Sequence, residues 1–510
     1  RGREGRLRPG LRSGPPVACL STGRSSCAGA RVRMCPGSDE GPTVPPYLKA
    51  MEAVQAMMPD WPAWSVKYLV GTGAFAFAAL GLEMALRPKR KAPSSASGET
   101  KEEKASSTAV PAGFRAFQAR YLAVYLVVML ADWLQGTNMY TLYTGYGVDT
   151  ASLFLGGFLS SAVFGTVLGL FVDDYGRKLA CMVFCFLEVV INLLEHVPDF
   201  RLLLVGRVLG GLSTSLLFSS FESWMVSEHR KQGYPEELLS STFALASTGN
   251  GIMAIIAGLI AQVACDRLGD IGPFQAAIAL TVLAWVLIAT LWDENKAEHE
   301  GEAATRSGWA TLKSSVSESS ALIWTRPAIA GIGMAMALFE GAMYTFVFNW
   351  VPRLMQLAPT ALPTGIVFSS FMVCVSAGGI LYSLAQEHKV TAEATSHGIF
   401  IMSALAMAVC AVSNQLDPTM IAFCAFETFV GVSFACLGVL RSRYIPESHM
   451  AGILACVRLP LNLLVVIGTK LSDVWPADRV FWVCTAWHLG ASAVLALGLS
   501  VDAKRKAKTK

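Results

Sequence analysis

The sequence predicts an all-α polytopic membrane protein, and three observations support this. Of its 510 residues, 53% are hydrophobic and only 15% are charged, whereas about a quarter of the residues are charged in an ordinary soluble domain. The mean hydropathy is +0.47. The apolar residues fall in blocks of about 20, a length that crosses the roughly 30 Å hydrocarbon layer of a bilayer as a helix. This pattern excludes an ordinary soluble enzyme.

The first segment, residues 1–50, is expected to lie outside the fold. It is rich in Arg, Ser, Gly and Pro, and Glu4 is its only acid before residue 34. This composition is typical of an organelle transit peptide. Because the chain does not begin with Met, an artefactual upstream segment is an equally good interpretation, with Met34 or Met51 as the start.

Thirteen apolar spans follow. The first, at 66–86, is an extra transmembrane helix, and a Lys-, Glu-, Ser- and Ala-rich linker at 87–116 separates it from the others. The other twelve spans are expected at about 120–145, 150–172, 177–196, 200–225, 238–265, 272–292, 327–350, 364–385, 396–413, 418–440, 449–470 and 479–499. They form two six-helix bundles, at 117–292 and 327–499, joined by a central loop at 293–326 and followed by a basic tail at 500–510.

Basic residues predict the orientation of these spans. Assigning alternate loops to opposite sides places 24 Lys and Arg on one side and five on the other. Because basic residues near span ends are retained in the cytoplasm, the linker, the central loop and the C-terminus are expected to be cytoplasmic. The N-terminus is then expected outside.

Weak sequence similarities between the two halves indicate that they are a parallel repeat. Asp132 and Glu340 occupy equivalent depths in the first span of each half, 208 residues apart. Ser161 and Ser370 match in the next spans with an offset of 209. The small-residue pattern at Gly211 recurs at Gly431. The nearly constant offset favours duplication of one six-helix unit.

Several functions are not supported by the composition. The net charge of +4 is too small to indicate nucleic-acid binding. The 12 cysteines contain no CxxC pair, and most lie in or beside apolar spans, so they are interpreted as packing residues and no metal site is expected. No Walker loop, HExxH, GxSxG or dinucleotide motif occurs. We therefore expect no cofactor and no hydrolytic energy source in this chain.

The most distinctive local pattern is GLFVDDYGRK at 169–178, between the second and third of the twelve spans. It resembles the GxxxDRxGRK signature of the major facilitator superfamily, with Asp174 in place of the usual Arg. The resemblance implies a gating role for the following residues: Gly169, Asp173, Gly176, Arg177 and Lys178. Asp173 can accept hydrogen bonds from helix N-termini and basic groups and so hold one conformation.

Further motifs narrow the resemblance. They are the segment ADWLQ at 131–135, LVGRVLGGLSTSLLFSSFESW at 204–224, GIVFSSFM at 365–372, and IPE at 445–447 with RLP at 458–460. Over roughly 117–500 the chain resembles the eukaryotic molybdate-anion transporter branch of that superfamily, which also has the isolated preceding helix. The resemblance implies the major facilitator fold and a secondary transporter that imports molybdate by alternating access between two bundles.

A tetrahedral dianion at mid-membrane depth needs positive charge and several hydrogen-bond donors. Arg207 and Arg458 are the only basic residues well inside the twelve spans, one in each half, and are the leading candidate ligands. An equally open alternative is that each pairs with an acid and only holds helices together. Neutral donors are expected from Ser161, Thr214, Ser370, Asn250 and Asn462, with Ser160 and Ser369 as neighbours.

Four intramembrane carboxylates are candidates for function: Asp132, Glu222, Glu340 and Glu427. Such groups are costly in a bilayer and functional by default. They either carry a coupling proton or neutralise the two arginines in the empty carrier. Glu188 and Glu195 lie nearer a membrane surface, and an ion pair is the favoured interpretation for them.

Two alternative functions remain open from the sequence. The first is a carrier of another anion or of a small organic solute, and the second is a non-transporting receptor on the same fold. The expected location is the plasma membrane, with the lipid bilayer and an oxyanion as partners.

Overall fold

The computed structural model describes residues 45–86, 110–167, 176–295 and 317–508. Every regular element within these ranges is a helix. Among the described residues, 11 helices are long and apolar enough to cross a membrane. Two more of the predicted spans are helical but fall short of that standard. The apolar part of α5 is brief, and α7 has 18 residues that include Arg177, Lys178 and Glu188.

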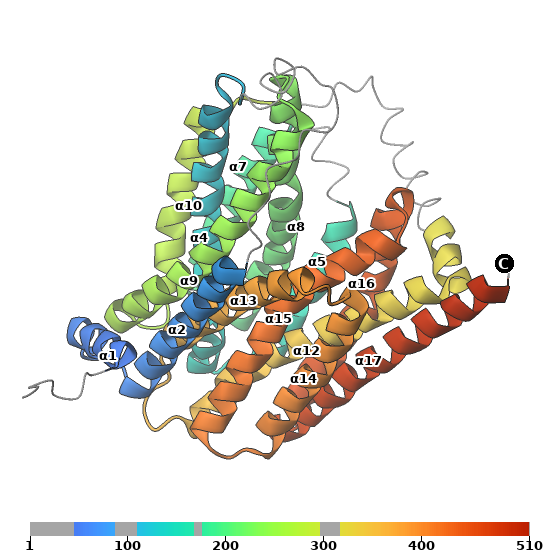
Figure 1. Cartoon of the computed structure of the whole chain (residues 1–510). Coiled ribbons are helices and arrows are strands. Elements are labelled where there is room, and N and C mark those ends of the chain that lie inside the picture. Colours follow the sequence, from blue (N-terminus) through green and yellow to red (C-terminus); the bar gives the residue numbers. More distant parts are fainter. Residues whose placement is uncertain (1–44, 87–109, 168–175, 296–316, 509–510) are drawn as a thin grey trace, which may run out of the picture. The chain divides into compact units, whose positions relative to one another are not determined.

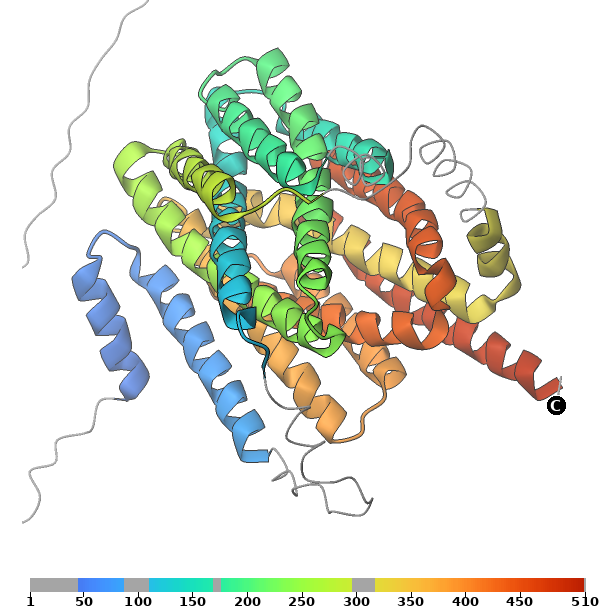
Figure 2. The same cartoon turned by 90° about the horizontal axis from the view of Figure 1, so that it is seen from above.

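Two helices precede the twelve-span region. The helix α1 spans Pro46–Met57, and α2 spans Ala63–Leu86, which agrees with the predicted extra transmembrane helix. The helix α1 was not predicted, and it overlaps the end of the segment expected outside the fold. Figure 2 shows both helices at the margin of the helical assembly.

The N-terminal half contains six helices: α4 (Phe114–Tyr146), α5 (Thr150–Val167), α7 (Arg177–Leu194), α8 (Phe200–Lys231), α9 (Glu236–Leu268) and α10 (Gly272–Leu291). They are the blue-green to yellow-green group in Figure 1. The predicted second span extends beyond residue 167 into positions that lie outside the described residues.

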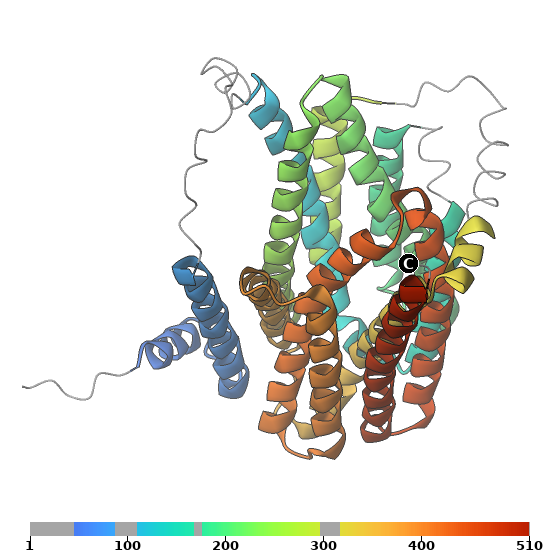
Figure 3. The same cartoon turned by 45° about the vertical axis from the view of Figure 1, so that its right-hand side comes forward.

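The C-terminal half contains another six: α12 (Pro327–Leu357), α13 (Thr364–Glu387), α14 (Ala392–Val412), α15 (Leu416–Tyr444), α16 (Met450–Val474) and α17 (Ala477–Lys508). Figures 1 and 3 show them as the yellow to red group. The last helix continues through most of the segment predicted as a basic tail. A short turn of 3-10 helix, Glu447–His449, precedes α16.

Local sequence sets several of the helix ends. The Asp199 carboxylate accepts hydrogen bonds from the backbone N–H groups of Arg201 and Leu202, which caps the start of α8. His229, Arg230 and Lys231 occupy its last turn, where positive charge stabilises the helix C-terminus. We call the membrane side that holds the last turn of α8 the basic face, and the other side the opposite face.

The two halves repeat the same helix pairings. In the N-terminal half α5 packs on α8, α7 on α8, and α4 on both α9 and α10. The C-terminal half has the equivalent contacts of α13 with α15, α14 with α15, and α12 with both α16 and α17. Glycines at the predicted repeat positions allow close packing, because Gly211 abuts Ser161 of α5 and Gly431 abuts Val375 of α13. These pairings agree with duplication of a six-helix unit.

The halves meet mainly along two helix pairs, α9 with α13 and α5 with α16, and α4 also contacts α12 and α13. A side chain at Gly258 of α9 would lie 2.5 Å from the backbone oxygen of Gly365 in α13, so the backbones touch there. Nearby, the Ser369 hydroxyl donates a hydrogen bond to the Ile255 carbonyl at 2.8 Å. Since α13 begins at Thr364 on the opposite face, this crossing joins the halves on that side.

Candidate functional site

The first predicted arginine, Arg207, lies inside the N-terminal half. Its guanidinium carbon is 5.6 Å from the centre of the Phe154 ring, and its Nη1 donates to the Met139 sulfur at 3.1 Å. A side chain at Gly157 would meet the guanidinium at 2.9 Å, so glycine there makes room for it. The buried Nε makes no hydrogen bond with the described residues.

Two acids of α7 share this region, and ion pairing was the interpretation that the sequence favoured for both. Arg207 acts electrostatically on both Glu188 and Glu195. Glu188 is buried and accepts hydrogen bonds from Ser213 at 2.6 Å and Gln135 at 2.7 Å, whereas Glu195 accepts one from Tyr143 at 2.8 Å. A half-buried cation near two hydrogen-bonded carboxylates is compatible with the charge-pairing alternative for Arg207.

The second predicted arginine, Arg458, has a different setting. It is exposed on α16 and acts electrostatically on Glu340 and Tyr344 of α12. Arg441, from the last turn of α15, acts on Glu340 as well. Its Nη2 lies 3.9 Å from the position that a side chain at Gly438 would take, so the guanidinium lies back along α15. The C-terminal half therefore gathers two cations, one carboxylate and one phenol.

An aromatic cluster lies between the two arginines. It consists of Phe154 and Phe158 of α5 with Tyr344 and Phe348 of α12. The ring centres of Phe154 and Phe348 are 5.0 Å apart, and those of Phe158 and Tyr344 are 5.2 Å apart. Arg207 lies over Phe154 and Arg458 acts on Tyr344, so the cluster links the two cations across the halves.

The predicted hydroxyl and amide donors are not all free to bind a ligand. Thr214 donates to the Gly210 carbonyl at 2.8 Å, and Ser370 donates to the Ile366 carbonyl at 2.9 Å within a buried region. Asn250 accepts a hydrogen bond from Trp133 at 2.8 Å, which leaves its amide N–H groups available. Ser161 and Asn462 are half-buried. Ser160 and Ser369 each donate to a backbone carbonyl of an adjacent helix.

The four predicted carboxylates occupy separate places. Asp132 interacts electrostatically with Glu188. Glu340 lies with Arg441 and Arg458 in the C-terminal half. Glu427 is buried and makes no hydrogen bond or ion pair within the described part of the chain. Glu222 is exposed on α8. The structure therefore does not bring these acids together.

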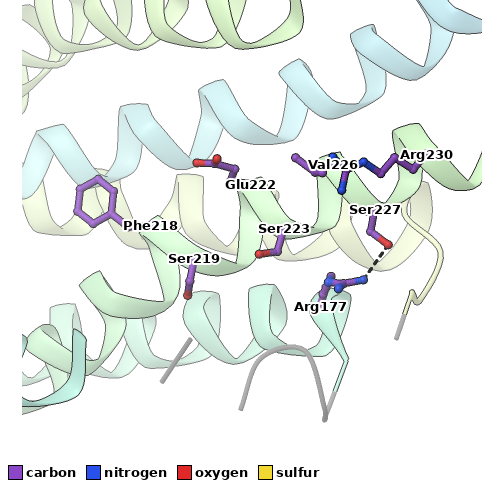
Figure 4. Close-up of a pocket in the computed structure, with 8 residues that line it drawn as sticks. All are labelled: Arg177, Phe218, Ser219, Glu222, Ser223, Val226, Ser227 and Arg230. Carbon is purple, nitrogen blue, oxygen red and sulfur yellow. Dashed lines mark hydrogen bonds between the residues drawn. The ribbon is translucent and has the colours of Figure 1, made fainter. Parts of the chain in front are cut away.

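Glu222 lines a cavity of about 500 Å³ in the basic-face half of α8. Figure 4 shows one face of α8 that carries Glu222 together with the hydroxyls of Ser219, Ser223 and Ser227. Arg177 reaches the same cavity from α7 and donates to Ser227 at 2.7 Å. This cavity is polar, and its lining extends to Arg230 in the last turn of α8, at the basic face.

Only part of the predicted gating motif can be described, because Gly169 and Asp173 lie outside the described residues. Gly176 has a φ of +118°, and a side chain there would meet the Glu294 carboxylate at 2.9 Å. That carboxylate accepts hydrogen bonds from the backbone N–H groups of Lys178 and Leu179, both at 3.0 Å. Lys178 in turn donates to the Trp292 carbonyl at 2.6 Å. The motif thus ties the start of α7 to the end of α10.

A second cavity, of about 400 Å³, lies on the opposite face. Phe154 and Phe348 of the aromatic cluster line it, together with Asp149 and Asp473. The pKa of Asp149 is lowered, mainly by a hydrogen bond from Ser152. Phe158 and Tyr344 lie one helical turn deeper, so the aromatic cluster separates this cavity from the middle of the membrane.

The sequence interpretation gave Arg441 no role in the site, and for Glu188 it favoured an ion pair. From the sequence, Arg441 was counted only among the loop cations that indicate orientation. The structure shows that its guanidinium lies back along α15 beside Gly438 and acts electrostatically on Glu340. Glu188 lies within the third of the twelve predicted spans. A carboxylate in an apolar helix is a signal of function that the sequence itself offers. The partners of Glu188, which are Gln135 and Ser213, come from α4 and α8, and their proximity could not be read from spacing.

Comparisons with known proteins agree with this architecture. A major facilitator family model described as sugar transporters with 12 transmembrane segments matches residues 95–466. The molybdate-anion transporter of Xenopus tropicalis is 35% identical over 368 residues, which cover 70% of this chain and 78% of the relative. The Xenopus laevis protein of that name is 35% identical over 393 residues, covering 74% and 84%.

Solved structures share the fold at low sequence identity. The crystal structure of a POT peptide transporter in complex with sulfate matches with a TM-score of 0.61 and 13% identity. The match covers 80% of this chain and 99% of that one.

Proposed function

Because the chain belongs to the molybdate-anion transporter branch of the major facilitator superfamily, we propose that it imports molybdate across a membrane by alternating access. The relatives are transporters and the fold is a transporter fold, so the protein is a multi-pass membrane transporter and not an enzyme. Sequence similarity to the molybdate-anion transporters over most of the chain is the observation that carries the substrate assignment.

We place the substrate path between the halves, with Arg207 and Arg458 on either side of the aromatic cluster. Support comes from charge, because burying a dianion requires cations and donors. Arg458 is the more accessible of the two, and Arg441 adds a second cation near Glu340. Asn250, Asn462, Ser161, Thr214 and Ser370 complete the proposed donor set, of which Asn250 has free amide N–H groups.

The contacts between the halves support assignment of the structure to one state of the cycle. They run from the middle of the membrane to the opposite face, whereas the cavity beside Glu222 lies in the basic-face half of α8. We propose that the basic face is cytoplasmic, so that this is the inward-open state in the plasma membrane. Exchange of protons at Glu222, Glu340, Glu427 or Asp132 is the proposed source of coupling.

The test is uptake of molybdate by purified protein in proteoliposomes. Uptake that requires the protein, and that excess unlabelled molybdate or sulfate reduces, supports the proposal. Binding without counterflow would instead identify a non-transporting receptor.

A second candidate substrate is a small organic solute, because the matching family model is described as sugar transporters. Competition separates the two cases. Uptake of a labelled sugar that molybdate does not inhibit would favour the organic solute.

A further inference from the structure

The extra N-terminal helix contacts both halves of the carrier on the opposite face. Just before α2, the Trp61 indole N–H donates to the Asp266 carboxylate at 2.9 Å, near the end of α9 in the N-terminal half. Within α2, Lys67 and Tyr68 bind the Asp417 carboxylate at the start of α15, with distances of 3.0 and 2.5 Å. One short segment thus joins two bodies that must move during transport.

The contact with the C-terminal half is the more extensive one. The helix α2 packs along α13, and the indole N–H of Trp64 donates to the Thr360 hydroxyl at 3.4 Å, in the turn before α13. Together with Lys67 and Tyr68 on Asp417, this gives α2 three polar attachments to that half. Rigid-body motion of the half is therefore expected to carry α2 with it.

The contact with the N-terminal half is concentrated at Trp61. Its ring is buried, with 7% of its surface exposed, in a cluster with Val66 and Ile366 against Leu259 and Val263 of α9. Asp266 also accepts a hydrogen bond from Gln262 at 2.8 Å, and Gln262 accepts one from the Gly365 backbone N–H at 3.2 Å. A hydrogen-bonded chain therefore runs from Trp61 through α9 to the first turn of α13.

We propose that α2 is a latch that moves with the C-terminal half. It stabilises the state closed on the opposite face through the hydrogen bond from Trp61 to Asp266. Opening that face requires α9 and α13 to separate there, because their backbones touch at Gly258 and Gly365. If α2 follows α13, separation breaks the Trp61–Asp266 hydrogen bond. The latch rests on alternating access as proposed above, and not on the identity of the substrate.

The first test measures the conformational equilibrium without substrate. Val465 of α16 is buried against the aromatic cluster, so Val465→Cys should react with an impermeant maleimide only when the opposite face opens. Native cysteines that react with the reagent are replaced by Ser. Trp61→Phe keeps an aromatic ring and removes the donor N–H. Because a hydrogen bond to a charged group is among the stronger ones in proteins, labelling should rise about tenfold or more.

The matched control is Trp64→Phe, which removes an indole N–H from the same segment but only a contact within the C-terminal half. It should leave labelling of Val465→Cys unchanged. Equal labelling of the two variants, or no rise with Trp61→Phe, would overturn the latch. Melting temperatures of both variants, compared with the parent, show whether either effect is general loss of folding.

The second test uses a reducible thiol cross-linker between introduced cysteines. Bridging positions 61 and 266 should stop transport until reductant is added, whereas bridging positions 67 and 417 should leave transport intact. Continued transport with positions 61 and 266 bridged would contradict the latch. Absence of molybdate uptake by the unmodified protein would contradict the proposed function instead. The maleimide labelling would still test the latch, because it is measured without substrate.

Discussion

At the scale of single residues, the two intramembrane arginines have unlike surroundings. Arg207 is half-buried against Phe154 and Met139 and acts electrostatically on the acids of α7, whereas Arg458 is exposed and acts on Glu340 and Tyr344. A planar guanidinium offers a donor fork to an oxyanion and also stacks on an aromatic ring, and lysine does neither well. The position of each guanidinium relative to the aromatic cluster thus decides whether it can donate hydrogen bonds to an anion or stacks on a ring instead.

Replacing either arginine by lysine should reduce molybdate transport sharply. We expect Arg207→Lys and Arg458→Lys each to lower binding by about tenfold or more, since charge-assisted hydrogen bonds contribute about 1.5–3 kcal/mol. The measurement is molybdate binding to purified protein. Arg353→Lys is the control, because Arg353 is buried at the opposite-face end of α12 and donates to the Ser413 carbonyl and to Asn414. Parent-like binding by folded Arg207→Gln and Arg458→Gln proteins would place the site elsewhere.

A change at Glu222 should alter coupling more than affinity. Its carboxylate lines the basic-face cavity, away from the aromatic cluster, so Glu222→Gln removes an ionisable group from the exit path without touching either arginine. We expect a flattened pH dependence of uptake and a molybdate affinity within about threefold of the parent. Uptake by proteoliposomes across a pH series measures this. An unchanged pH profile would remove Glu222 from the coupling scheme.

At the scale of helices, backbone contact between α9 and α13 sets how closely the halves approach. A side chain at Gly365 would lie 2.3 Å from the Gly258 carbonyl oxygen and 2.7 Å from the Gln262 nitrogen. Both obstructing atoms are backbone atoms, which cannot move aside as a side chain tip does. Glycine at this crossing is therefore a requirement for closure on the opposite face.

Gly365→Ala should force the crossing apart. Overpacking of this kind typically costs about 1–3 kcal/mol of stability. We therefore expect a lower melting temperature and greater solvent exposure of the residues at the α9–α13 crossing. Gly379→Ala is the matched control, since Gly379 lies on the same helix with nothing within 4 Å of the added methyl. Thermal unfolding in detergent compares them. Equal stability of the two variants would show that the crossing adjusts freely.

The junction of α7 and α10 gives a second prediction at this scale. The Glu294 carboxylate accepts two backbone N–H groups at the start of α7. Removing its charge with Glu294→Gln should cost about 1 kcal/mol, because both capping and the helix dipole favour an anion there. Glu237→Gln, an exposed acid in the first turn of α9 without such a cap, should change the melting temperature far less.

At the scale of the whole molecule, the repeated halves explain how one chain can serve two faces of a membrane. Equivalent helix pairs build each half, and the halves touch through α9 with α13 and α5 with α16. Rocking about these contacts would close one cavity while opening the other. The helix α2 adds an element outside the repeat, attached at one end to both halves.

We infer the orientation of the molecule from its charge distribution, since the loops carry 24 basic residues on one side and five on the other. We expect the C-terminus to be cytoplasmic. An epitope tag placed after Lys510 should be detected by antibody only after the cells are permeabilised. Detection on intact cells would contradict the topology, and a tag before α2 should show the reverse pattern.

The sequence by itself determined the helical class, the thirteen spans and the division into halves, because hydropathy and helix length are local properties read along one segment. It also singled out charged residues within apolar helices, of which Glu427 is buried whereas Glu222 and Arg458 are exposed. Only the tertiary structure decided their surroundings. The approach of Glu188 to Gln135 and Ser213, the electrostatic action of Arg441 on Glu340, and the attachment of the α2 segment to Asp266 and Asp417 all join residues from different helices. Such contacts depend on how helices cross and rotate about their axes, which packing sets and local sequence does not.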